Sequence, residues 1–292
     1  MYSTKMVLSI VESNKYLCST MLSGTPFLVG RLGGNECNIA AYEFKKSRIF
    51  KYTARERIAA WTVAGIFPPS RSTLDEFSKT YLKALKNADC LAEWPVGIQP
   101  NIDFISNLLD TQIPRINFSV LDIFYCAEYV EIEKLWIQNF KNKSVLVVHP
   151  FSKSFILQMN RINTVHKSPI LPNFDPTFYA PPQSNGLNIS TKKYIKQLQI
   201  CMTEIEALSK TNKFDFALIA AGGYGLPLAS FLKNLGISSI YVGGALQLYF
   251  GVSGNRWKNR QDLKKYKTNY WLDHPLEKPP VGSSLVENRT YW

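Results

Sequence analysis

Arg31 and Glu36 are the charged residues best placed for chemistry in the first part of the chain. They follow the apolar run Phe27–Val29, which predicts a short buried strand, and they flank the bare backbone of Gly33 and Gly34. A guanidinium fork suits the paired oxygens of a diphosphate. A carboxylate in this position can bind a divalent cation or act as a general base. A structural ion pair at a turn is the alternative interpretation.

Three more candidates follow predicted strands or glycines. Glu93 supplies a second carboxylate after a strand, and His149 ends the most regular apolar run of the chain. A lone histidine in that position is more often a satisfied core residue, so His149 also has a structural interpretation. Arg256 follows a glycine-rich segment and precedes Trp257, where its guanidinium can reach an anion beside an aromatic ring.

Two apolar runs in the second half of the chain end in glycine turns. The runs and their turns are Phe216–Ala221 with Gly222, Gly223, Tyr224 and Gly225, and Ile240–Val242 with Gly243 and Gly244. In a parallel sheet such turns meet at the carboxyl edge, where backbone N–H groups face anionic ligands. Turns without a ligand are the alternative. The third glycine of a dinucleotide fingerprint would fall at Leu228, and no Walker motif is present, so neither a nicotinamide cofactor nor P-loop chemistry is expected.

Strands alternate with helices along the whole sequence, which predicts an α/β fold: a doubly wound, mostly parallel sheet with helices on both faces, Rossmann-like. We expect a single composite domain over residues 1–292 with an irregular aromatic tail, 256–292, along the sheet edge. The segment 165–188 is expected to be an extended connection. Two further strands are predicted at 89–92 and 145–148. Helices are predicted at 55–66, 127–140 and 192–208. Another helix should begin at a capping box of Thr73 and Glu76, and a last one should run from Pro227 to about Gly236.

A formal charge of +12 favours an anionic partner. The basic residues gather in two segments: Lys45, Lys46, Arg48, Lys51, Arg55 and Arg57, and Lys258, Arg260, Lys264, Lys265 and Lys267. A nucleotide, a phosphorylated lipid carrier or an anionic membrane face fits this balance, and a solvated basic surface is the alternative. Nucleic acid is not an expected partner, because no recognition helix, zinc finger or aromatic RNA-binding signature is present.

The cysteines and the apolar runs indicate the cellular compartment of the protein. Five scattered cysteines without a Cys-x-x-Cys pair favour reduced thiols in the cytoplasm over a disulfide framework or a zinc site. The apolar runs are too short to span a bilayer, and the first residues lack a signal-peptide pattern. A cytoplasmic protein, at most peripheral at the inner face of the membrane, is expected.

The motif Arg31–Glu36 resembles the N-terminal Arg-x-Gly-x-x-Glu signature of glycosyltransferases of the GT-D fold. Further segments, in order along nearly the whole chain, resemble a related set of bacterial proteins encoded with surface-polysaccharide genes. These segments are 64–68, 88–91 with Trp94, 143–151, 170–172, 224–229, 243–248, 254–257, 286–287 and 291–292.

The resemblance implies transfer of a sugar from a nucleotide-sugar donor, often a UDP-sugar, to a growing glycan or lipid-linked glycan. In GT-D enzymes an Asp-x-Glu pair after the first strand binds the metal that bridges the donor diphosphate. Glu36 matches the glutamate, but Gly34 occupies the aspartate position, which leaves a requirement for Mn²⁺ or Mg²⁺ open. Arg256, His149 or the basic surface would then neutralise the diphosphate.

Two functional hypotheses follow. In the first, the chain is a glycosyltransferase of surface-glycan synthesis whose donor diphosphate lies over the glycine turns, with Arg31 and Arg256 as anion contacts. Glu36 is then the metal ligand or base, and Glu93 and His149 are further candidates. In the second, the chain binds a nucleotide or glycan of the same pathway without catalysis, which accounts for the missing aspartate.

Overall fold

The computed structural model describes residues 6–44, 52–94, 100–109, 112–187, 192–286 and 289–292, and its centre is one parallel sheet. The described part of the chain forms a seven-stranded sheet in the order β3-β2-β1-β7-β6-β4-β5, and every neighbouring pair is parallel. The strands are β1 Leu28–Arg31, β2 Cys90–Glu93, β3 Arg115–Asn117, β4 Ser144–Val148, β5 Asp175–Tyr179, β6 Phe216–Ile219 and β7 Ser238–Tyr241.

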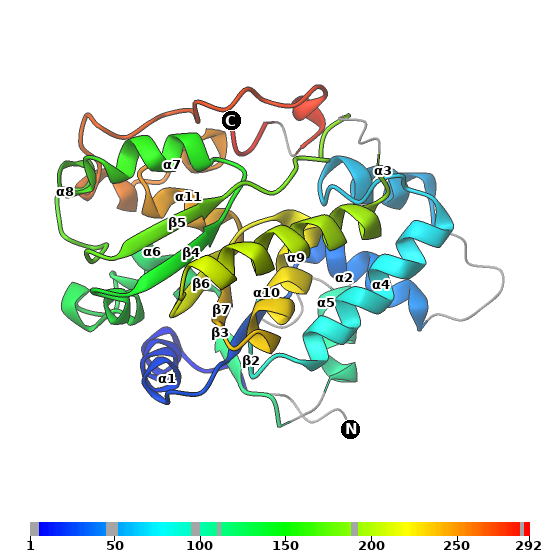
Figure 1. Ribbon diagram of the computed structural model, residues 1–292, viewed down its shortest axis with the longest axis horizontal. Helices are drawn as coiled ribbons and strands as arrows, with labels where there is room; N and C mark the ends of the chain where they lie inside the picture. The colour runs from blue at the N-terminus through cyan, green and yellow to red at the C-terminus, as the bar shows by residue number, and fades with distance from the viewer. Residues whose placement is uncertain (1–5, 45–51, 95–99, 110–111, 188–191, 287–288) are drawn as a thin grey trace.

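Helices connect these strands and cover the sheet (Figure 1). The α-helices are α1 Ile10–Leu22, α2 Gly34–Ala40, α3 Ala54–Thr62, α4 Arg71–Lys86, α5 Pro100–Leu108, α6 Ile123–Cys126, α7 Ser152–Met159, α8 Ile162–Val165, α9 Tyr194–Thr211, α10 Gly225–Asn234 and α11 Leu246–Tyr249. The 3-10 turns are η1 Ala41–Glu43, η2 Phe118–Leu121, η3 Ile132–Lys134, η4 Trp136–Phe140, η5 Gly222–Tyr224, η6 Gly243–Ala245, η7 Asn255–Trp257, η8 Asp262–Lys265 and η9 Ser283–Leu285.

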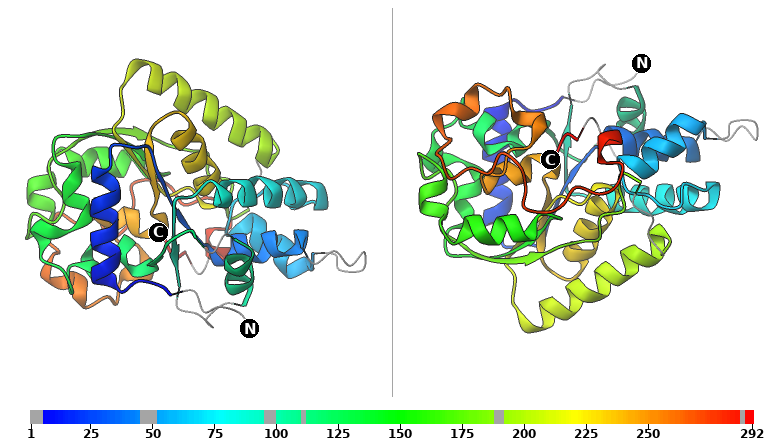
Figure 2. Two further views of the ribbon diagram at one scale, coloured as in Figure 1. Left: turned by 90° about the horizontal axis from the view of Figure 1, so that it is seen from below. Right: turned by 90° about the horizontal axis from the view of Figure 1, so that it is seen from above.

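The sheet is buried on both faces, because successive residues of its strands contribute to two separate cores. In β4, Val145 and Val147 belong to one hydrophobic cluster, whereas Leu146 and Val148 belong to the other. The first cluster includes α1, which lies apart from α4 and α9 in the two further views (Figure 2). The second includes α4, α9 and α10. Continuous apolar strands such as β4 are typical of sheets covered by helices on both sides.

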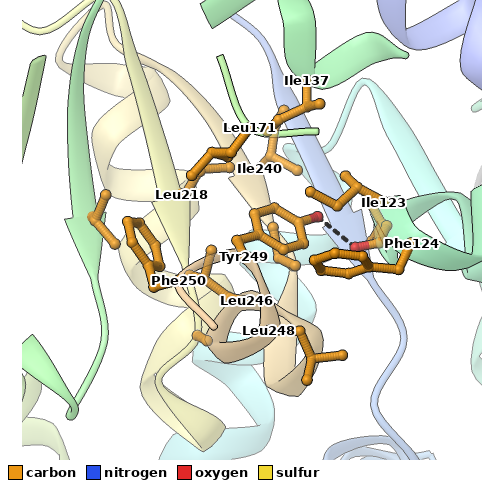
Figure 3. Packing of buried hydrophobic residues seen from close by; sticks show 14 of the residues in the cluster. Ile123, Phe124, Ile137, Leu171, Leu218, Ile240, Leu246, Leu248, Tyr249 and Phe250 are labelled. Carbon is orange, nitrogen blue, oxygen red and sulfur yellow. Dashed lines mark hydrogen bonds between the residues drawn. The ribbon is translucent and has the colours of Figure 1, made fainter. Parts of the chain in front are cut away.

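The first core is rich in aromatic side chains close to the end of β7. Tyr249 and Phe250 pack among Leu218, Ile240 and Phe124 (Figure 3), and the hydroxyl of Tyr249 donates a hydrogen bond to the carbonyl of Leu121. This packing fixes the chain that follows the glycine turn after β7.

β1 and β7 are parallel neighbours near the middle of the sheet, where Leu28 pairs with Ser239 and Val29 with Ile240, so their carboxyl ends lie side by side. From β1 the chain continues to β2 on one side, whereas β7 is reached from β6 on the other side. Open α/β sheets bind ligands at such reversals of strand order. The fold therefore brings the segments that follow Arg31 and Tyr241 to one edge.

The predicted fold class is confirmed, but several elements differ from the prediction. β3 and β5 were not expected, and β5 lies in the segment predicted to be an extended connection. The single helix predicted at 127–140 is wrong, because the chain forms η3 and η4 there. The cap of α4 is Ser70, whose hydroxyl accepts from the N–H of Thr73, so the predicted capping box is also wrong.

Two expectations from the sequence concern the first basic cluster and membrane-spanning segments. Of the basic residues in the first cluster, Lys45, Lys46, Arg48 and Lys51 lie outside the described residues. Within the described ranges, no helix combines the length and the apolar composition required to cross a bilayer.

Candidate active site

A cavity of about 450 Å³ lies at the carboxyl edge of the sheet, a size typical of small-molecule sites. The segments after β1, β4, β6 and β7 contribute to its wall, together with the loop before α9 and the end of the chain. Its lining includes Arg31, Gly33, Gly34, Glu36, His149, Asn185, Gly222, Tyr241, Gly243, Gly244, Gln247, Arg256, Tyr291 and Trp292. Most of the residues predicted from the sequence are therefore brought together in one hollow.

Arg31 places its guanidinium in this wall. Its Nε is buried and has no hydrogen-bond partner among the described residues. The guanidinium carbon lies 4.5 Å from the centre of the Phe118 ring, a cation–π contact, and Phe118 in turn stacks on Trp94 at 4.1 Å. A Cβ at Gly243, whose φ is +73°, would collide with Nη1 of Arg31. Glycine at that turn therefore lets the guanidinium lie across it.

Glu36 lies in the first turn of α2 and is 8% exposed. Its carboxylate folds back over the bare Cα of Gly33, where any side chain would collide with Oε2. The carboxylate also acts on Tyr241 across the cavity: burial, and then the negative charge of Glu36, raise the pKa of that phenol. Tyr241 therefore stays protonated, and its hydroxyl donates to the carbonyl of Gly222 at 3.1 Å.

Three further residues of the wall carry buried polar atoms without a partner among the described residues. They are acceptors on two amides and a donor on an indole: Asn185 Oδ1, Gln247 Oε1 and Trp292 Nε1. Gln247 is fully buried, and its amide nitrogen is already bound to the carbonyls of Val252 and Ser253. Buried polar groups are normally paired with protein groups, ordered water or a ligand, so these three atoms are groups that a polar ligand can pair.

Sequence reasoning did not identify these three residues or Tyr241. Asn185 stands in a loop without a motif, and Gln247 follows the glycine turn in a short apolar helix. The available signals were the aromatic tail and the segments 243–248 and 291–292 of the resemblance, which contain Gln247 and Trp292. Trp292 packs on Phe151 with ring centroids 5.7 Å apart and closes the cavity together with Tyr291.

His149 lines the cavity as a neutral side chain. Its Nδ1 accepts the backbone N–H of Phe151 at 2.9 Å, so the ring proton is on Nε2. Burial lowers the pKa of this imidazole to about 3. The expectation that His149 neutralises the diphosphate is therefore corrected: it carries no charge at neutral pH, and it can only donate a hydrogen bond from Nε2.

The buried histidines should make stability depend on pH. Burial also lowers the pKa of His166, to about 4, from an ordinary value of 6.5. Below pH 6.5 the unfolded chain then binds protons that the folded chain does not. The free energy of unfolding should fall as pH falls from 6.5 towards 4, by up to about 1.4 kcal/mol per pH unit for each imidazole.

Urea unfolding at pH 7 and pH 5 measures this dependence. His149→Gln should reduce the loss of stability between the two pH values, because the glutamine does not titrate. An identical loss in wild type and in His149→Gln would show that burial of His149 does not govern it.

One residue of the glycine turn after β6 lines the cavity, and the other three pack in the interior. Gly222 lines the cavity, whereas Gly223, Tyr224 and Gly225 are not part of its lining. The N–H of Gly223 donates to the carbonyl of Ala64 at 2.9 Å, and the hydroxyl of Tyr224 bonds to that of Ser184 at 2.8 Å. The donor-binding role expected for these three residues is therefore corrected to a packing role.

Gly225 has the clearest packing role. A Cβ there would collide with the ring of Tyr241, so Gly225→Ala should lower the free energy of unfolding by roughly 1–3 kcal/mol, the cost of overpacking. Adding Tyr241→Leu should recover part of that loss by making room. Denaturant titration of the single and double variants measures both effects. A change below about 0.5 kcal/mol in Gly225→Ala would contradict a packing role.

The turn after β7 keeps both of its glycines in the cavity wall, and the end of the chain lies against it. A Cβ at Gly244 would come within 2.9 Å of the Tyr291 ring. Arg256 is exposed, lies 5.7 Å from the centre of the Trp257 ring, and donates from Nη1 to the hydroxyl of Tyr291 at 3.4 Å. Arg256 thus reaches the cavity from its rim, whereas Arg31 reaches it from within the wall.

Glu93 is engaged elsewhere. Its carboxylate forms an ion pair with Arg115 at 2.9 Å and accepts the hydroxyl of Ser106, and both members of the pair are buried. It does not line the cavity. The carboxylate predicted as a second catalytic candidate therefore holds β2 to β3 and α5, a structural role.

The described wall contains no preformed site for a divalent cation. Glu36 is the carboxylate that the described lining provides, and position 34, where the resemblance would put an aspartate, is glycine. The described residues contain no group of three His, Cys, Asp or Glu side chains that could hold an ion. Ions of this kind usually take one or two carboxylates together with substrate phosphates. We therefore derive no step through a metal.

Comparison with known proteins places the fold. No protein-family model and no curated protein matches the chain. Among solved structures, it is similar to a selenomethionine-substituted domain of unknown function 1792 (DUF1792), with a TM-score of 0.51 and 15% identity over 82% of this chain and 78% of that one. That likeness shows a shared fold and agrees with the α/β fold predicted from the sequence.

Two further solved structures resemble the chain. One is a DUF1792 protein from Streptococcus sanguinis described as a new glycosyltransferase, with a TM-score of 0.48 and 14% identity over 82% of this chain and 81% of that one. The other is a DUF1792 domain described as having a distinct glycosyltransferase fold, with a TM-score of 0.47 and 14% identity over 82% of this chain and 78% of that one.

Proposed function

We propose that the chain is a glycosyltransferase that moves a sugar from a nucleotide-sugar donor, a UDP-sugar in the first instance, to a glycan or lipid-linked glycan. The observation that carries the proposal is the guanidinium of Arg31, buried at Nε without a partner in the wall of the cavity. A buried donor without a hydrogen-bond partner is costly, and a diphosphate compensates it with paired oxygens. The motif 31–36 supports the same function, and the fold shared with a DUF1792 domain is compatible with it.

The remaining wall suits the rest of such a donor. The indole N–H of Trp292 and Nε2 of His149 are donors for phosphate or sugar oxygens, and the amide oxygens of Asn185 and Gln247 are acceptors for sugar hydroxyls. A ligand that combines an anionic diphosphate with hydroxyl groups satisfies both kinds of atom. Inorganic phosphate alone would leave the acceptors unpaired.

The transfer step assigns one task to each charged group. The bond between the anomeric carbon and the β-phosphate oxygen breaks, and its electron pair leaves with the diphosphate, whose charge Arg31 and, from the rim, Arg256 stabilise. The acceptor hydroxyl oxygen forms the new bond to the anomeric carbon. Its proton passes to the carboxylate of Glu36, the general base of the proposal.

The alternative is a binding protein of the same pathway, and the glycine at position 34 is the feature that favours it. Such a protein would hold the donor through Arg31 without turning it over. Binding alone therefore does not separate the two functions, and the discriminating observation is release of nucleoside diphosphate from the donor.

The experiment is a release assay over a panel of UDP-, GDP-, ADP- and dTDP-sugars with membrane glycan extracts as acceptor, run in EDTA and with added Mn²⁺. We expect release of the nucleoside diphosphate from one donor at equal rates under both conditions, because Arg31 and Arg256 supply the positive charge. Release that disappears in EDTA and returns with Mn²⁺ would show that a cation takes part. No release from any donor, in a protein that binds the nucleotide, would favour the binding protein.

A further inference from the structure

A second cavity, of about 660 Å³, adjoins the first along the same edge of the sheet. The two cavities share part of their lining: Arg31, Trp94, Gly244 and Arg256. Both arginines therefore stand at the boundary between two hollows, and a ligand bound to them can extend into each.

Aromatic rings line this second cavity. Tyr125 and Tyr129 are 36% and 53% exposed, and their ring centroids lie 5.5 Å apart. Phe118 and Trp257 complete the aromatic part of the wall. The Phe118 ring already contacts the guanidinium of Arg31 and the stacked ring of Trp94, and Trp257 is buried. The exposed tyrosines are therefore the rings available to a ligand.

Apart from the two arginines at the boundary, the charged side chains that line this cavity already form ion pairs. Arg260 bonds to Asp122 at 2.5 Å and also to Asp262, and Glu128 bonds to Lys265 at 2.5 Å. None of these pairs needs an external ion. The second cavity thus suits a flat, uncharged group that stacks on aromatic rings, and the charge available to an anion is at the boundary.

We infer that the second cavity holds the nucleoside of the donor, with its base packed against the tilted rings of Tyr125 and Tyr129, while the diphosphate lies at Arg31 and Arg256 and the sugar lies beside Glu36. This inference rests on the proposed function and deepens it. A nucleotide sugar has an anionic diphosphate between an uncharged nucleoside and an uncharged sugar. The protein has the same order: an arginine-lined boundary lies between the second cavity and the first. The end next to Glu36 takes the sugar, because the proton transfer occurs there.

Calorimetric titration with UDP and with pyrophosphate tests the inference, because pyrophosphate is the anionic part without the nucleoside. The double variant Tyr125→Ala/Tyr129→Ala should weaken UDP binding by roughly fivefold to 150-fold, the usual effect of losing a base stack, and leave pyrophosphate binding unchanged. Tyr125→Phe/Tyr129→Phe keeps the rings and should keep the UDP affinity. Tyr270→Ala removes a tyrosine of similar exposure, 49%, outside both cavities and should change neither.

The outcomes separate this inference from the proposed function. If the double alanine variant binds UDP like the wild type while Arg31→Ala binds it more weakly, the nucleoside lies elsewhere and the proposed function stands. If the double alanine variant loses the same affinity for UDP and for pyrophosphate, the tyrosines influence the arginines and do not contact the base. That result also overturns the inference. If wild type binds none of UDP, GDP, ADP and dTDP, both the inference and the proposed function are wrong.

Discussion

Glu36→Gln should lower the turnover of sugar transfer by about 10² or more, in line with the loss of a general base. The substitution keeps the size of the side chain and its fit over Gly33, and it removes the charge that accepts the proton. The donor Kd should change little, because the diphosphate contacts belong to Arg31 and Arg256. Steady-state release of the nucleoside diphosphate, with donor affinity measured separately, tests this split between kcat and binding.

Two controls make the result specific. Glu76→Gln changes an exposed carboxylate on α4, outside the cavity, and should leave the rate unchanged. Thermal unfolding of Glu36→Gln shows whether the fold is intact. Full transfer activity in a folded Glu36→Gln protein would remove Glu36 from the mechanism.

Arg31→Ala should weaken binding of the nucleoside diphosphate by roughly 1.5–3 kcal/mol, the usual range for hydrogen bonds to a charged group. Arg31→Lys should recover only part of this loss, because the ammonium keeps the charge but lacks the planar fork. Gly243→Ala should weaken binding as well, since its Cβ would displace the guanidinium from the turn. Calorimetric titration of the three variants with UDP measures how much affinity each one loses.

Arg71→Ala is the matched control for charge. Its guanidinium is 74% exposed on α4, outside the cavity, so its removal changes the net charge by the same amount without touching the site. Equal losses of affinity in Arg31→Ala and Arg71→Ala would show that the net charge of the protein, and not the position of Arg31, determines binding.

The parts of the site that follow from local sequence were predictable. Arg31, Glu36 and Gly243 each come within a few residues of a buried apolar strand, and parallel strands end at a common edge, so the sequence alone places them together. The same reasoning predicted the parallel sheet. It missed β3, a strand of three residues, which is shorter than an apolar pattern can show.

The errors arose where the decisive contact is distant in sequence. Glu93 looked catalytic because its partner Arg115 lies on the unpredicted β3. Gly225 looked like part of an anion-binding turn, but the ring that requires a glycine there, that of Tyr241, belongs to the next strand. Burial likewise decides that His149 is neutral, and burial depends on Phe151 and Phe155, which pack on its ring only in the folded chain.

The central claim is that the cavity beside Arg31 binds a nucleoside diphosphate or its sugar, and thermal unfolding with and without such ligands tests it most directly. A ligand at 100 times its Kd stabilises the folded chain by about 2.7 kcal/mol. The account predicts a rise in Tm with millimolar UDP or UDP-sugar in the wild type and a smaller rise in Arg31→Ala. No rise with any nucleoside diphosphate or nucleotide sugar, or the same rise in both proteins, would contradict it.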